Sequence, residues 1–220
     1  MANDLDDPLI REINDELKQE KLEKLWKAYG GYAVGGALAV VAGVAGVQAW
    51  FSYDLNQRTE ASQRFAQAQA LSVKDKSADA IAAFEVIAKD GGSYALLSRF
   101  RATALLGSSG NTSLAIAAYS AIANDTDVEP LYRDLAVVLG SFQELNTSAE
   151  KSAGLSDRVQ VLAKGDGPWR LSAKEAVALF ALARGDLKSA HTLYAELAED
   201  ASVPQALRER ANEMSKITGK

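Results

Sequence analysis

The stretch "SLAIAAYSAIA" at residues 113–123 recurs twice along the chain in altered form. Its relatives are "ADAIAAFEVIA" at 78–88 and "KSAHTLYAELA" at 188–198. In each copy an alanine precedes an aromatic residue by four positions, which places both side chains on one face of a helix. We predict that the alanines let neighbouring helices approach closely and that the rings fill the remaining gap. The six predicted packing residues are Ala80, Phe84, Ala115, Tyr119, Ala190 and Tyr194.

The spacing of the copies indicates a repeated structural unit. The first two copies lie 35 residues apart, and the third lies 75 residues further along. Because 75 is about two repeat lengths, a more degenerate unit is expected at roughly 140–170. Gly110-Asn111 and Gly185-Asp186 precede the second and third copies at the same distance, so each glycine is expected to end the preceding helix.

Short clusters rich in Gly, Asn, Asp and Ser separate the remaining segments, none of which shows sustained strand alternation. Pro130, Pro168 and Pro204 close three of these clusters, at positions where new helices are expected to begin. The pattern predicts an all-α chain of antiparallel helix pairs, an α-solenoid, over residues 53–220. The clusters lie at 89–93, 107–111, 123–130, 146–154, 164–168, 184–186 and 199–204.

An apolar stretch, "YGGYAVGGALAVVAGVAGVQAWF" at 29–51, lies upstream of the repeats. No charged residue occurs between Lys27 and Asp54, and this run exceeds the about 20 residues that a membrane-spanning helix needs. A buried core helix rarely runs so far without a charged face. Two alternatives therefore stand against each other: a retained membrane anchor and a cleaved signal peptide.

The flanks of this stretch favour a retained anchor. "VQA" at 47–49 resembles a small-x-small cleavage site, but the run is longer than the about 7–15 apolar residues of a signal peptide. Trp50 and Phe51 follow at one end, and Tyr29 and Tyr32 stand at the other, as interfacial aromatic residues do. We predict one transmembrane helix at 30–52.

Basic residues predict the orientation of this helix. Four lysines lie close to its N-terminal end, whereas only Arg58 and Arg64 lie comparably close to the other end. The excess of positive charge marks the cytoplasmic side. Residues 1–29 are therefore expected in the cytoplasm and residues 53–220 outside it, which in a bacterium means the inner membrane and the periplasm. The four lysines are Lys18, Lys21, Lys24 and Lys27.

Small residues recur every four positions within the apolar stretch, at Gly31, Gly35, Ala39 and Gly43. Such a face lets two membrane helices approach closely. It indicates either a contact with a second copy or with another membrane protein, or only the ordinary composition of membrane helices.

The segment 8–29 is predicted to form an amphipathic helix that precedes the membrane. Asp7 is a suitable cap and Pro8 suits the first turn. Apolar residues recur along one side, with Glu and Lys on the other. The helix is expected to lie on the membrane surface, to dock on a cytoplasmic partner, or to be a solvated extension of the anchor.

The composition argues against catalysis. Cysteine is absent and His191 is the only histidine, which excludes thiolate metal sites and histidine clusters. A net charge of −5 gives no basic footprint for nucleic acid. "GSSGN" at 107–111 lacks the lysine of a phosphate loop, Trp169 is expected to anchor a turn or the core, and "RGD" at 184–186 occupies a repeat turn. We predict no enzymatic activity, no metal and no cofactor.

The period near 34, with Gly-Asn or Gly-Asp followed by Ala and then Phe or Tyr, resembles the tetratricopeptide repeat. The first helix of each unit departs from that pattern, as at Thr103, where a glycine is usual. The complete layout, with "EKLEKLWKAYG" at 20–30 running into the apolar stretch, resembles the bacterial tetratricopeptide-like ancillary subunits of the Sec translocon. This resemblance implies a single-pass inner-membrane protein that associates with the translocon and with periplasmic chaperones.

The same scaffold suits a second role in the cell envelope. A coordinator of cell division or wall synthesis, or a stress-signalling regulator that sequesters a partner, would also combine an anchor with repeats. The cytoplasmic segment 1–27 is where a signalling regulator would act.

Overall fold

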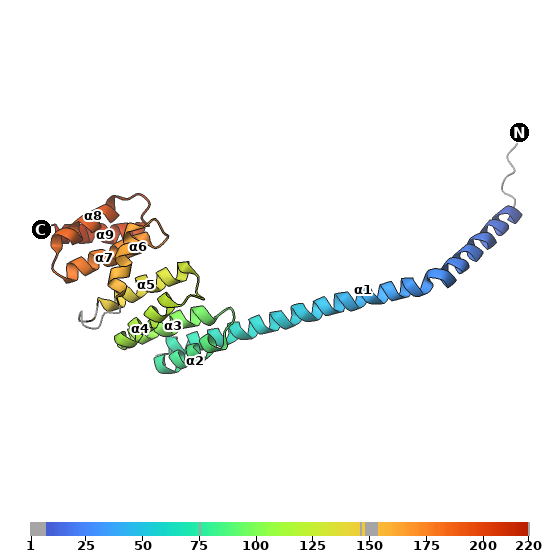
Figure 1. Cartoon of the computed structure of the whole chain (residues 1–220), viewed down its shortest axis with the longest axis horizontal. Coiled ribbons are helices and arrows are strands. Elements are labelled where there is room, and N and C mark those ends of the chain that lie inside the picture. The colour runs from blue at the N-terminus through green and yellow to red at the C-terminus, as the bar shows by residue number, and fades with distance from the viewer. Residues whose placement is uncertain (1–7, 75, 146, 148–153, 220) are drawn as a thin grey trace, which may run out of the picture. The chain divides into compact units, whose positions relative to one another are not determined.

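The computed structural model describes residues 8–74, 76–145, 147 and 154–219, with side chains from Leu17 onward. Within these ranges every regular element is a helix, which confirms the predicted all-α class (Figure 1). The chain consists of two compact units, Met1–Thr59 and Glu60–Lys220. The helices are α1 (Pro8–Val73), α2 (Ser77–Asp90), α3 (Ala95–Ser108), α4 (Thr112–Asn124), α5 (Pro130–Glu144), α6 (Leu155–Lys164), α7 (Arg170–Ala183), α8 (Leu187–Glu199) and α9 (Gln205–Thr218).

Helix α1 is one uninterrupted helix of 66 residues. It has no end near residue 29 or 52, so the predicted cytoplasmic helix and the apolar stretch are continuous. No proline occurs in α1 beyond its first residue, which explains why the backbone hydrogen bonding is not broken. The predicted cap Asp7 and the apolar side chains of the first turns, such as Ile10 and Ile13, lie outside the described residues.

In the second unit, the last turns of α1 already belong to the repeat array. Phe65 and Ala68 are buried together with Ala80 and Phe84 of α2. The rings of Phe65 and Phe84 lie 5.2 Å apart between centroids, a normal distance for a packed aromatic pair. The end of α1 is therefore the first helix of the first helix pair.

The turn between α1 and α2 was not predicted. Here Lys76 N–H donates to the Leu71 carbonyl at 3.2 Å, and α2 begins at Ser77. The sequence "KDK" at 74–76 has no glycine or proline, so it carries no strong turn signal.

The two predicted turn glycines end their helices in the same way. Gly110 and Gly185 have φ values of +82° and +76°, in the left-handed region that favours glycine. The N–H of the next residue then donates to a carbonyl five positions back: Asn111 to Leu106, and Asp186 to Ala181, each at 2.9 Å. This pattern is the Schellman motif of helix ends.

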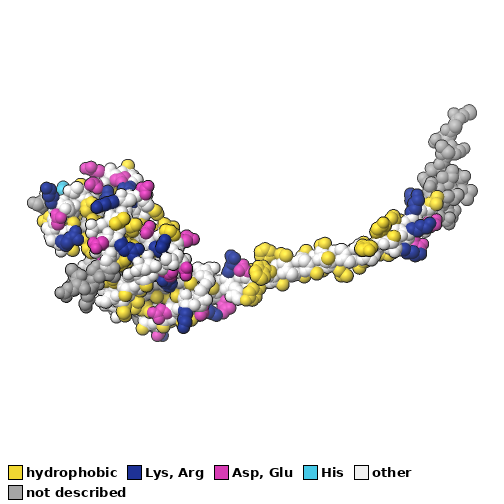
Figure 2. All heavy atoms as spheres, viewed as in Figure 1, with side chains coloured by type: hydrophobic (Ala, Val, Ile, Leu, Met, Phe, Trp, Pro, Cys, Tyr) yellow, Lys and Arg dark blue, Asp and Glu magenta, His cyan; other side chains and the backbone are white. Residues whose placement is uncertain are grey.

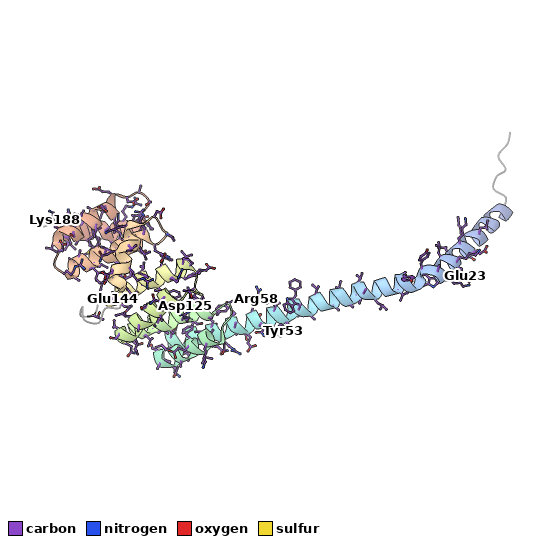
Figure 3. All side chains as sticks on the ribbon, viewed as in Figure 1. Glu23, Tyr53, Arg58, Asp125, Glu144 and Lys188 are labelled. Carbon is purple, nitrogen blue, oxygen red and sulfur yellow. The ribbon has the colours of Figure 1, made fainter. Side chains whose placement is uncertain are left out.

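The degenerate unit expected at 140–170 contains the end of α5, the short helix α6 and the start of α7. Glu144 stabilises this region from the last turn of α5. The residue is 5 % exposed, and its carboxylate accepts hydrogen bonds from the N–H groups of Leu155, at 3.2 Å, and Ser156, at 2.9 Å. Glu144 is labelled in Figure 3. An anion at this position satisfies two of the free N–H groups at the start of α6 and complements the helix dipole.

Apolar side chains form three successive clusters along the array. The first joins the end of α1 to α2 and α3, the second joins α4 to α7, and the third joins α7, α8 and α9. Close approach occurs at Gly140 of α5, where a Cβ atom would lie 2.9 Å from Tyr119 Cβ and would clash with Leu155 Cδ1. Each helix pair thus depends on its neighbours for burial, as expected for a solenoid.

Candidate functional site

The two side chains that the sequence offers as candidates for chemistry, His191 and Trp169, each join helices of the array. Among the described residues, no three His, Asp or Glu side chains converge where they could hold a metal ion. His191 is half-buried, and its Nδ1 lies 2.9 Å from the Ser215 carbonyl, so it joins α8 to α9. Trp169 Nε1 donates to the Leu131 carbonyl at 2.8 Å, which makes this residue a link between α7 and α5. The candidate functional regions are the exposed apolar part of α1 and the surface of the repeat array.

The first such surface is the apolar part of α1. This helix is long and apolar enough to cross a membrane, and none of its most apolar window is buried in the protein. Figure 2 shows this part of α1 without charged side chains, between charged segments on both sides. At one end Lys24 and Lys27 pair with Glu20 and Glu23, each at 2.7 Å, and at the other Arg58 pairs with Asp54 at 2.9 Å.

The predicted small-residue face is open in the structure. Gly31, Gly35, Ala39 and Gly43 are all exposed, and a Cβ atom at any of the three glycines would meet nothing within 4 Å. Gly30 lies outside this four-residue spacing. Its Cβ would lie 3.0 Å from Trp26 Cδ2, because the indole ring packs over it.

The six predicted packing residues are buried in the repeat array. Each of the three alanines is 0 % exposed, and the aromatic residues Phe84, Tyr119 and Tyr194 are 1 %, 3 % and 2 % exposed. Burial raises the pKa of Tyr119, and it raises the pKa of Tyr194 to about 12, with a further contribution from the Glu175 carboxylate. These side chains form the packed interior on which the exposed surface of the array rests.

The alkaline limit of stability is expected to depend on Tyr194. Its pKa is about 12 in the folded protein and 10.0 in the unfolded chain, so the stabilisation is complete below pH 10 and is lost as the pH rises from 10 to 12. The loss should amount to about 2 kcal/mol. Urea denaturation at pH 8 to 12 should show a shallower alkaline decline for Tyr194→Phe than for the wild type. An identical decline in both proteins would contradict this expectation.

Recurrent ion pairs join the first helix of a pair to the end of the second helix. Arg64 contacts Asp90 at 3.0 Å, Arg99 contacts Asp125 at 2.6 Å, and Arg170 contacts Asp200 at 3.4 Å. The hydrogen bond from Arg99 holds the pKa of Asp125 below its usual value. The pKa of Asp200 is also lowered, chiefly by Ser202 and further by Arg170.

These ion pairs were not predicted from the sequence, although their regular spacing could have revealed them. The first two pairs have the same separation of 26 residues and recur at the repeat offset. The predicted turn at "RGD" has a related polar role, since the Asp186 carboxylate accepts a hydrogen bond from Ser189 N–H at 3.0 Å and caps α8.

Two open clefts lie on the surface of the array. One, of about 370 Å³, lies among α2, α3 and α4, and the other, of about 450 Å³, lies among α6, α7 and α8. Both combine apolar side chains with lysine and arginine, and each also has one glutamate in its lining, Glu85 in the first and Glu196 in the second. No cleft was predicted, because each one needs three helices that are separated in the sequence.

Comparison with known families agrees with this architecture. The family model of the tetratricopeptide repeat-like domain matches residues 23–139, from α1 to α5. The match includes the apolar part of α1 and the first two copies of the repeated stretch. The chain therefore belongs to the tetratricopeptide repeat-like family, whose domains are scaffolds for protein–protein interaction. No curated protein and no solved structure matches the chain.

Proposed function

We propose that this protein is a non-catalytic interaction scaffold of the bacterial inner membrane. Residues 30–52 anchor it, residues 1–29 lie in the cytoplasm, and residues 53–220 present the repeat array in the periplasm. There it associates with the Sec translocon and with periplasmic chaperones, and it assists newly exported proteins. The observation that carries this proposal is the presence of an exposed apolar segment and a tetratricopeptide-like array in one chain.

The exposure of the apolar segment supports its role as an anchor. A core helix would be covered by the rest of the protein, whereas this segment is not. A cleaved signal peptide would be separate from the mature fold. Instead, α1 continues from the apolar segment to Phe65 and Ala68, which are buried in the first cluster.

The surroundings of the segment support its orientation and length. Lysines are concentrated before it, and paired charges bracket it at both ends. Exposed Tyr29 and Tyr32 at one end, and Trp50 and Phe51 at the other, suit the two interfacial regions of a bilayer.

The resemblance of the whole layout to ancillary subunits of the Sec translocon supports the choice of partners. The small-residue face of α1 suits a contact with a membrane helix of the translocon or with a second copy. The exposed surface of the array suits soluble partners, since stacked repeats form extended binding surfaces.

Site-specific photocrosslinking in native membranes tests the proposal. A photoreactive residue at Ala39 probes the small-residue face, and one at Val161, which is 72 % exposed on α6, probes the array. We expect a membrane subunit of the translocon at the first position and translocon or chaperone proteins at the second. Val41 is the matched control, because it lies on the opposite side of α1, about 200° around the helix.

Two results would count against the proposal. Equal capture of the same partners at Ala39 and Val41 would remove the small-residue face as the contact. Capture of neither translocon nor chaperone proteins at any position would contradict the export role, and a dominance of division or signalling proteins would favour the second envelope role.

A further inference from the structure

We propose that the two clefts of the array are equivalent subsites for one acidic, partly apolar extended segment of a partner protein. The proposal rests on the interaction role given above and adds to it the site and the chemistry of the partner. The two subsites are called cleft 1, among α2, α3 and α4, and cleft 2, among α6, α7 and α8.

The linings of the two clefts correspond at the repeat offset of 75 residues. Seven of the ten residues that line cleft 1 have counterparts among the nine that line cleft 2. Such agreement is expected when one surface feature is repeated by the fold. The corresponding pairs are Glu85 and Gln160, Ala88 and Ala163, Lys89 and Lys164, Arg99 and Lys174, Ala102 and Val177, Ala118 and Leu193, and Ala121 and Glu196.

Basic residues are kept at two of these corresponding positions. Lys89 and Lys164 are exposed, each in the last turn of its helix, and no acidic residue pairs with them in the described part of the chain. Arg99 and Lys174 are engaged, with Asp125 and Glu196. The two lysines are therefore the unpaired basic groups available to a ligand, and cleft 1 also contains one acidic side chain, Glu85, that is unpaired within the described residues and whose counterpart in cleft 2 is the neutral Gln160.

Between the two clefts lies one further repeat of the array, in which a side chain of the protein itself occupies the corresponding space. This repeat contains α4, α5 and α6, and its Arg158 lies 40 residues after Ala118 and 35 residues before Leu193, at the corresponding position of α6. It donates to the Asn124 amide oxygen at 2.9 Å and to the Ala123 carbonyl at 3.1 Å. Arg158 thus reaches across the space that is open in the two clefts.

The last turn of the corresponding helix has a lysine in both clefts but Asn124 in the repeat between them, and this difference selects the charge of the occupant. Asn124, which accepts from Arg158, corresponds to Lys89 in cleft 1 and to Lys164 in cleft 2. A lysine there repels a cation and attracts a carboxylate. The apolar floor, which includes Ala118 and Leu193, accommodates an apolar side chain beside that carboxylate.

Binding of matched peptides tests this inference. Three fluorescein-labelled 12-residue peptides share the same leucines and differ only at four positions, which are all Glu, all Gln or all Lys. Their affinity for the full chain in detergent is measured by fluorescence anisotropy at about 0.1 M salt. We expect the Glu peptide to bind at least about tenfold more tightly than the Gln and Lys peptides.

Charge reversal locates the binding. The double variant Lys89→Glu with Lys164→Glu should weaken binding of the Glu peptide at least about tenfold, and each single variant should weaken it less. Lys216→Glu is the matched control, since Lys216 is also an exposed lysine in the last turn of its helix but lines neither cleft. It should leave the affinity unchanged.

Several results would overturn the inference: no binding of any peptide, tighter binding of the Lys peptide, or equal weakening by the double variant and by Lys216→Glu. These results are distinct from a failure of the proposed function. If photocrosslinking captures translocon or chaperone proteins while the clefts fail the peptide test, the scaffold role stands without these subsites.

Discussion

Replacing Phe84 with alanine should destabilise the first helix pair by about 3–5 kcal/mol, the largest loss of stability that we expect from a single side chain. Phe84 is 1 % exposed and contacts Phe65 at the end of α1. Truncation removes the apolar contacts and leaves a cavity among α1, α2 and α3. Phe65, whose ring also lies 5.1 Å from that of Tyr94 between centroids, would lose its contact with Phe84.

Hydrogen exchange followed by mass spectrometry resolves this effect along the chain. In a repeat array the loss should be local, because each pair depends mainly on its neighbours. Amides of α2 and α3 should exchange much faster in Phe84→Ala, whereas those of α8 and α9 should change little. Val86→Ala on the same helix is the control, since Val86 is 57 % exposed and should cost less than about 0.5 kcal/mol. Equal effects of the two substitutions would contradict the role of Phe84 in the core.

The repeat array was predictable where local chemistry alone decides the structure. A left-handed residue is needed at the end of a helix, so Gly110 and Gly185 mark turns whatever surrounds them. An alanine and an aromatic residue four positions apart define a buried helical face, which is why the copies at 78–88, 113–123 and 188–198 indicated paired helices.

Features that depend on distant residues were not predictable in this way. Glu144 caps a helix that begins eleven residues later, and its carboxylate gives no sequence signal beyond an ordinary charged residue. Gly140 is required because Tyr119 and Leu155 press against it from two other helices. The continuity of residues 8–29 with the apolar stretch was one of the alternatives that the sequence left open, because a change in composition from charged to apolar does not interrupt helical hydrogen bonding.

The same distinction between local and long-range features applies to the candidate interaction surfaces. The small-residue face of α1 is a property of one helix, so its spacing could be read directly from the sequence. Each cleft combines three helices, and the shared basic positions are recognised only when the two linings are compared residue by residue. The repeats can therefore be compared with one another within one molecule. Lys89 and Lys164 occupy equivalent positions in two repeats, whereas in the repeat between them Arg158 occupies the equivalent space.

Placing two charges in the apolar part of α1 is the second change for which we expect a very large effect. The double variant Val41→Asp with Val44→Asp puts both carboxylates near the centre of residues 30–52 and away from the small-residue face. Each charged residue at the centre of a spanning helix costs about 2.5–3.5 kcal/mol for insertion. The combined cost of about 6 kcal/mol corresponds to a roughly 10⁴-fold shift against the membrane.

Alkaline carbonate extraction and a topology reporter fused after Lys220 measure this effect together. The wild type should stay in the membrane pellet and give a periplasmic signal, whereas the Asp variant should be extracted and lose that signal. Val41→Leu with Val44→Leu alters the same positions without adding charge, and it should behave as the wild type does. Retention of the Asp variant in the membrane would mean that residues 30–52 are not the anchor. A cytoplasmic signal from the wild type would instead reverse the orientation inferred from the lysines, and the array and its clefts would then meet cytoplasmic partners.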